Sequence, residues 1–131
     1  MKFPLIVSLG FVLLSCSSKQ DRDFSGTYTC IADNGSELTL ALYKDSTYAH
    51  TSLMNTKGLG FDGYPEKGTI QLNGKWKVEK DTLILNQENI SILGETSKSS
   101  QILKFYIVEF DQNKLVLKDQ NQVIRDYTRK N

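Results

Sequence analysis

The sequence predicts an all-β domain, a small up-and-down antiparallel barrel of about eight strands that follows an N-terminal signal segment. Three observations predict this fold class. Apolar residues alternate with polar ones in short segments, turn residues separate these segments at intervals of about 8–12 residues, and no stretch after Cys16 has the 3.6-residue period of a stable helix. Antiparallel strands in this number can close on themselves, which removes the exposed sheet edges.

The first segment, residues 1–15, has the features of a secretory signal. A lysine precedes an apolar run from Phe3 to Leu14. The run is shorter than the about 20 residues that a membrane-spanning helix needs, and it fits the 7–15 apolar residues typical of a signal peptide. Pro4 and Gly10 argue against the alternative, a buried core helix.

The end of this run, "LLSC" at residues 13–16, resembles the lipobox of bacterial lipoproteins, although Leu14 stands where that family usually has a small residue. The resemblance implies that Cys16 carries a diacylglycerol and a further acyl chain such as palmitate. Two or three chains would hold the protein at a membrane, where one chain holds only marginally. Ser17 stands where an inner-membrane retention signal would have aspartate, so the resemblance implies the outer membrane, facing the periplasm or the cell surface.

Residues 16–23 then form a lipidated cysteine and a polar tether, and the strands follow it in order. Leu38, Leu40 and Leu42 share one face of a strict alternation that predicts a half-buried strand. Turn residues bound it on both sides. The predicted strand segments are 26–31, 36–43, 47–53, 68–86 with its two strands, 101–111, 114–119 and 123–129.

One position inside residues 68–86 has two interpretations. Asn73-Gly74 is either a two-residue hairpin turn or a bulge within one long strand. We favour the bulge, because the strand then continues to Trp76 and Val78. We expect strands of about 6–9 residues and a nearly filled interior.

Two connections have an irregular composition. Glycines and a proline interrupt residues 54–68, and the polar stretch "GETSKSS" at residues 94–100 predicts a mobile loop. The first connection also carries Phe61 and Tyr64, which no strand there can bury. They would either plug the barrel end or contact a ligand or partner.

From Phe24 onward, the sequence resembles the small lipocalin-like barrels of envelope lipoproteins in Gram-negative bacteria. "FSGTY" is similar to the G-x-W opening of lipocalins with Tyr28 in place of tryptophan, and "GKWKVEKDTLIL" and "LVLKDQNQVIRDYTRK" are similar to later parts of these domains. The resemblance implies one lipocalin-like domain over residues 24–131. It also implies that Arg125 or Arg129 packs over Tyr28 to close the barrel.

The spacing of G-x-Y, D-x-T-Y and G-x-W further resembles the lipoproteins of copper homeostasis and envelope stress. Those proteins carry a C-x-x-C pair in the first hairpin, where this chain has "IADNGSE". Their metal or redox function is therefore not carried over, and we expect neither a cofactor nor a metal. The resemblance supports the fold and leaves the activity open.

Composition excludes some classes of function. The net charge of +1 falls to zero once Lys2 leaves with the signal, so the chain lacks the basic excess of a nucleic-acid-binding protein. If Cys16 is lipidated, Cys30 has no intramolecular partner and the domain has no disulfide framework.

No residue pattern predicts catalysis, so we expect a protein that is not an enzyme. The G-x-G-x-x-G at residues 58–63 lacks a following helix, and the calcium-loop-like start at Asp21 meets Ala32 where the bidentate acid belongs. His50 is the only histidine, and we interpret it and Cys30 as barrel-wall residues.

Two functional hypotheses remain. The leading one is a non-enzymatic, lipid-anchored envelope protein whose barrel mouth binds a small apolar ligand through Phe61, Tyr64 and Trp76. The alternative is a structural or interaction lipoprotein with a filled barrel, which binds another envelope protein in a stress-sensing or assembly role.

Overall fold

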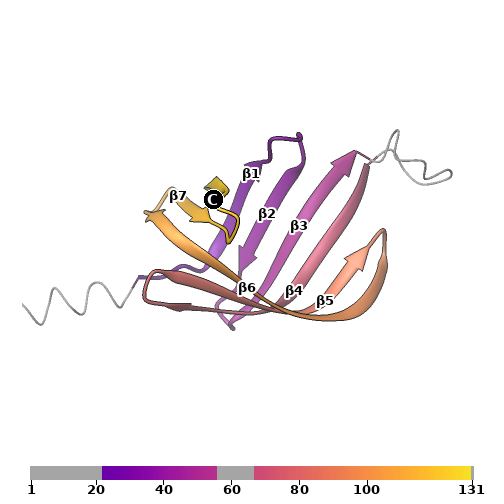
Figure 1. The fold of residues 1–131 in the computed structure, drawn as a ribbon, viewed down its shortest axis with the longest axis horizontal. Coiled ribbons are helices and arrows are strands. Elements are labelled where there is room, and N and C mark those ends of the chain that lie inside the picture. Colours follow the sequence, from indigo (N-terminus) through magenta and orange to yellow (C-terminus); the bar gives the residue numbers. More distant parts are fainter. Residues whose placement is uncertain (1–21, 56–66, 131) are drawn as a thin grey trace, which may run out of the picture.

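A computed structural model describes residues 22–55 and 67–130, which form a closed antiparallel barrel of eight strands (Figure 1). Each strand pairs with the next, and the last pairs with the first, so the predicted fold class is confirmed. No helix in the described ranges could cross a membrane. The strands are β1 (Gly26–Ile31), β2 (Glu37–Leu42), β3 (Thr47–Asn55), β4 (Lys67–Glu79), β5 (Thr82–Ile92), β6 (Glu95–Phe110), β7 (Lys114–Lys118) and β8 (Ile124–Lys130).

The alternation in β2 places its leucines in the barrel interior, as the sequence predicts. Leu38, Leu40 and Leu42 are all buried, and Leu40 is paired with Tyr28 of β1 and with His50 of β3. Directly paired residues point to the same face of a sheet. The pairings of β2 therefore identify the inward-facing residues of its two neighbours.

The bulge interpretation of Asn73-Gly74 is confirmed. β4 is one strand of 13 residues, and its register with β5 shifts between Asn73 and Gly74. A Cβ atom built on Gly74 would lie 1.9 Å from the backbone oxygen of Asn86. Only glycine fits where the two backbones approach this closely.

The expectation of a mobile loop at residues 94–100 is wrong, because this stretch begins β6. Its residues Glu95 to Lys98 pair with Ile92 to Asn89 of β5, around a turn at Leu93 and Gly94. Most of these side chains are polar and exposed, because this part of the strand projects into solvent. Its composition therefore resembles that of a loop. The predicted strand length is also too short, since β5 has 11 residues and β6 has 16.

One end of the barrel, which we call the closed end, lies at the β2–β3, β4–β5 and β6–β7 turns. Phe24 and Phe110 pack there with ring centroids 4.2 Å apart. The Arg129 guanidinium lies over the ring of Tyr28 and donates a 2.6 Å hydrogen bond from Nη2 to its hydroxyl. The Tyr28 hydroxyl in turn donates to the backbone oxygen of Phe24 at 2.7 Å. The interior is filled with side chains at this end.

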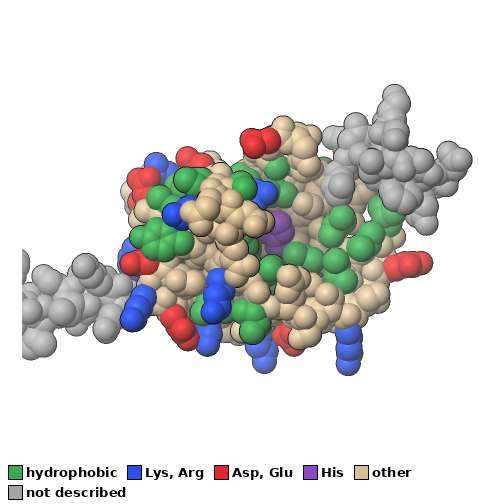
Figure 2. All heavy atoms as spheres, in the orientation of Figure 1, with side chains coloured by type: hydrophobic (Ala, Val, Ile, Leu, Met, Phe, Trp, Pro, Cys, Tyr) green, Lys and Arg blue, Asp and Glu red, His purple; other side chains and the backbone are tan. Residues whose placement is uncertain are grey.

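The walls separate towards the other end, which we call the open end. β6 pairs with β7 only over Tyr106 to Phe110, so its first eleven residues have a strand neighbour on one side only. β1 pairs with β8 only over Thr27 to Thr29. Figure 2 shows hydrophobic side chains and the purple side chain of His50, the only histidine, visible in the recess between the separated walls. The expectation of a nearly filled interior therefore holds for the closed end alone.

Candidate functional site at the open end of the barrel

Four residues with polar side-chain groups face the interior at the open end. His50 pairs with Leu40 and Leu72, and Cys30 pairs with buried Leu38. On β8, Arg125 pairs with Leu117 and Tyr127 with Leu115, and both leucines are buried. Strand alternation and barrel closure therefore bring together side chains from β1, β3 and β8.

His50 is held as a neutral imidazole. Its Nε2 lies 3.4 Å from the hydroxyl oxygen of Tyr127, a long contact whose direction depends on the tautomer. Burial and, to a smaller extent, the nearby positive charge of Arg125 together lower the pKa of His50 to about 4. At neutral pH this histidine offers a hydrogen bond without a charge.

Tyr127 and Cys30 are also neutral. The Tyr127 hydroxyl is in hydrogen-bond contact with the Cys30 sulfur, and burial raises the pKa of both groups. Only the thiolate form of cysteine is a strong nucleophile. Cys30 is consequently a protonated thiol in the barrel wall, in agreement with its interpretation from the sequence.

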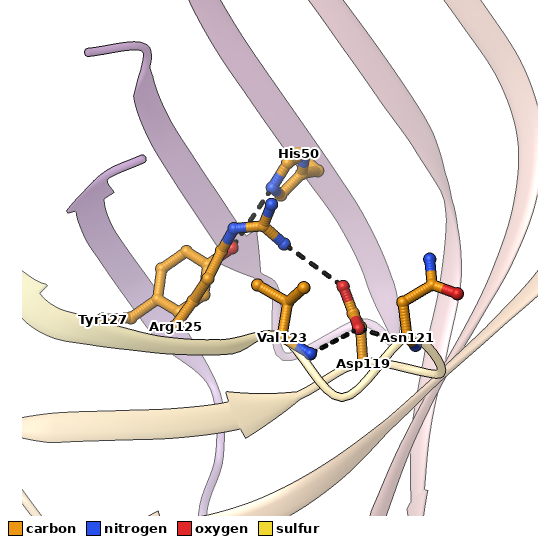
Figure 3. A network of polar contacts seen from close by, with 6 residues as sticks. All are labelled: His50, Asp119, Asn121, Val123, Arg125 and Tyr127. Atoms are coloured by element: carbon orange, nitrogen blue, oxygen red, sulfur yellow. Dashed lines mark hydrogen bonds and ion pairs between the residues drawn. The ribbon is translucent and has the colours of Figure 1, made fainter. Parts of the chain in front are cut away.

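Arg125 carries the positive charge of this cluster. Figure 3 shows its guanidinium between His50 and Asp119, with one ion pair from Nη1 to Asp119 Oδ2 at 3.6 Å. Asp119 lies in the β7–β8 turn, where its Oδ1 accepts hydrogen bonds from the backbone nitrogens of Asn121 at 2.8 Å and Val123 at 3.0 Å. The turn therefore positions the carboxylate, and the arginine reaches it only loosely.

Hollows lie beside this cluster where β1 and β8 separate. One of about 420 Å³ is bounded by Cys30, Ala32 and Arg125. A second of about 490 Å³ runs along β1 and β8 and is lined mainly by outward-facing residues such as Thr39 and Thr128, so it belongs to the outer surface. A third, of about 300 Å³, lies within the β5–β6 hairpin against Ile90 and Ile92. Volumes from about 300 to 1,000 Å³ are typical of sites for small molecules.

Apolar side chains continue from the polar cluster along the inner face. Leu72, which pairs with His50, also pairs with Ile90 of β5, and both are only partly buried. Leu103 of β6 is partly buried against the core as well. The open end thus combines a short polar wall with an apolar inner surface that solvent reaches.

Of the three residues predicted for ligand binding, the structure describes Trp76 alone. Trp76 lies near the closed end, where its Nε1 donates to the backbone oxygen of Tyr43 at 2.9 Å. Phe61 and Tyr64 lie outside the described residues, as do Cys16, the signal segment and the G-x-G-x-x-G stretch.

The two arginines that the lipocalin resemblance offers for barrel closure lie at different ends. Arg129 packs on Tyr28 at the closed end, while Arg125 faces His50 at the open end. Sequence reasoning did not identify Arg125 and Tyr127 as neighbours of His50. The alternation of residues 125, 127 and 129 in one strand is the signal that could have shown that they share a face.

The described residues offer little for catalysis or metal binding. No group of three or more His, Cys, Asp or Glu side chains there could hold a metal ion. The hydrogen-bond partner of His50 in that part of the chain is a tyrosine rather than a carboxylate. The cluster thus places one cation beside neutral hydrogen-bonding groups.

Comparison with known proteins agrees with the fold. A family model described as lipocalin-like matches residues 66–130, just under half of the chain. The matched part runs from β4 to β8 and includes Arg125 and Tyr127, while β1 and β3, which carry Cys30 and His50, precede it. No curated protein matches the sequence.

Proposed function

We propose that this lipocalin-like barrel is a non-enzymatic binding protein that takes a small, mainly apolar molecule at its open end. The observation that carries the proposal is the contrast between the two ends. The closed end is packed around Tyr28, which is fully buried, whereas Leu72 and Ile90 at the open end remain partly exposed on the inner face. Burying such a surface under a ligand is favourable at about 25 cal/mol per Å².

The test is a titration with N-phenyl-1-naphthylamine, a neutral fluorescent probe, followed by displacement with decanol. A chain that starts at Ser17 contains all eight strands and the whole described core, so it is suitable for this measurement. We expect saturable binding that Leu72→Gln weakens about tenfold. Ile102→Gln is the matched control, because Ile102 lies in β6 and is 59% exposed.

Trp76, the only tryptophan, reports which end is occupied. Decanol does not absorb the emission of tryptophan, so decanol bound at the open end leaves that emission unchanged, because the indole lies beside Tyr43 near the closed end. A saturable change in Trp76 emission with no effect of Leu72→Gln would place the ligand at the closed end and contradict the proposal.

A titration without binding would favour the second candidate, a protein that works through its outer surface. Ile102, Tyr106 and Val108 of β6 are 59%, 50% and 47% exposed and form an apolar row on the outer side of this strand. Such rows are typical of contact surfaces between proteins. The partner would then be another envelope protein, and Tyr106→Ser would reduce its co-purification.

We also propose that the protein is anchored to the outer membrane through lipid on Cys16. The support is the "LLSC" sequence and the polar stretch that follows it. We expect Cys16→Ser to abolish incorporation of a palmitate analogue and to release the protein from the membrane fraction, because acyl chains supply the anchoring free energy. Cys30→Ser is the matched control and should stay membrane-bound and labelled. Equal labelling of wild type and Cys16→Ser would contradict the proposal.

A further inference from the structure

The polar wall of the open end determines which class of ligand fits there, a role that rests on the proposed binding of an apolar molecule. Arg125 faces the interior, and its side chain remains 36% exposed. A guanidinium has five N–H donors in a fixed plane. Among the described residues, its contact with an acid is the single ion pair to Asp119 at 3.6 Å, which is longer than a hydrogen bond. Most of its donors are therefore available to a ligand.

Asp119 does not depend on this arginine. Its Oδ1 accepts two backbone hydrogen bonds in the β7–β8 turn, and its Oδ2 provides the loose ion pair. These backbone hydrogen bonds hold the carboxylate in the turn without a contribution from the arginine. Arg125 can consequently turn towards a ligand while the acid keeps its place in the turn.

The groups beside Arg125 suit an anion of modest size. The Tyr127 hydroxyl and the His50 imidazole lie 3.4 Å apart and are both neutral, so they offer hydrogen bonds without repelling a negative charge. The strand neighbours of His50, Leu40 and Leu72, are apolar. Leu72 and Ile90 then continue the inner surface away from the cation.

We propose that the ligand is an amphiphile with one carboxylate, whose head group binds Arg125 and whose chain lies along Leu72 and Ile90. The carboxylate oxygens accept hydrogen bonds from the guanidinium in the bidentate geometry that arginine favours. The hydroxyl of Tyr127 is within the same cluster and can donate a further bond. A ligand with an amine in the same place would face the positive charge of Arg125.

Binding of this anion has a consequence for His50. The charged and titratable groups that face it are Arg125 and Tyr127 from β8 and Cys30 from β1, with Asp119 behind the arginine. In the free protein, Arg125 disfavours protonation of the imidazole. A bound carboxylate offsets that positive charge, so the pKa of His50 rises when the acid binds and stays unchanged when a neutral ligand binds.

The experiment compares decanoate, decanol and decylamine, which share a chain length and differ in head-group charge. Calorimetric titration at pH 7.5 is expected to show decanoate binding at least about tenfold more tightly than decanol, with decylamine the weakest. Arg125→Met is expected to remove the preference for decanoate while retaining decanol binding. Lys104→Met, which removes an exposed cation from β6, is the matched control and should bind like wild type.

The outcomes separate this inference from the function on which it rests. Equal binding of decanoate and decanol would overturn the carboxylate proposal and keep the apolar site, whereas no binding of any compound would overturn both. A preference that survives in Arg125→Met would overturn the role of this arginine. If Arg125→Met does not fold, the proposal is tested on the wild type instead. The pKa of His50 is then measured from its imidazole NMR resonances with and without each ligand. A pKa that rises with decanoate and not with decanol supports the proposal, and one unchanged by decanoate overturns it.

Discussion

Replacing Gly74 with alanine is expected to lower the free energy of unfolding by about 3 kcal/mol or more. The added Cβ would lie 1.9 Å from the backbone oxygen of Asn86 and 3.0 Å from the backbone nitrogen of Glu88. These atoms belong to a paired strand, so relief of the clash requires β4 and β5 to separate at the bulge. For a domain of about 105 residues, the corresponding fall in melting temperature exceeds about 10 °C.

Chemical denaturation of Gly74→Ala and Lys75→Ala would measure this effect. Lys75 is the exposed neighbour in the same strand, and its alanine variant should lie within about 0.5 kcal/mol of wild type. If both variants unfold at the same denaturant concentration as wild type, the close approach of the two backbones is contradicted. The bulge would then tolerate a side chain.

Lowering the pH from 7 to 4 is expected to remove on the order of 3 kcal/mol of stability through His50 alone. The pKa of this histidine is about 4 in the folded protein and returns to its ordinary value of 6.5 on unfolding. Between these two values the unfolded chain binds a proton that the folded chain does not. Stability therefore falls as the pH decreases through this window and stops changing through this group below pH 4.

The measurement is denaturant unfolding of wild type and His50→Gln at several pH values between 7.5 and 4.5. Glutamine keeps a hydrogen-bonding group near Tyr127 and does not titrate. The two stability profiles should converge or cross as the pH falls, since only wild type loses stability to protonation at this position. Asp23, Asp45 and Glu79 have lowered pKa values in both proteins, so their effect cancels in the comparison. Parallel profiles would mean that residue 50 titrates normally.

Local sequence patterns predict most of the barrel because its strands follow one another in the chain. The alternation of Leu38, Leu40 and Leu42 reflects burial on one face, and glycine at position 74 reflects a close backbone approach. Residues 94–100 could not be predicted in this way. There, backbone pairing with β5 forms the strand, while polar side chains extend into solvent on a hairpin that leaves the barrel wall.

The candidate site is less predictable because it depends on contacts across the barrel. His50 and Tyr127 are 77 positions apart, and they meet only because β8 closes on β1 in a particular register. A lone histidine, a lone cysteine and an arginine in three distant segments carry no local motif. Trp76 is the opposite example, a residue predicted to share a site with Phe61 and Tyr64 because it is near them in the sequence. The 13 residues of β4 place it far from the end of the barrel where that strand begins.

The pairing of β1 with β8 also determines how this molecule can fold. Three residue pairs join strands that stand at opposite ends of the barrel sequence, from Thr27–Lys130 to Thr29–Thr128. Contacts between such distant residues slow folding, because the intervening chain loses its freedom before the contact is made. A chain still emerging during synthesis cannot close, and it presents the unpaired edges of β1 and β7 to other chains. Closure by the last strand is consequently the step at which this barrel either completes its fold or aggregates.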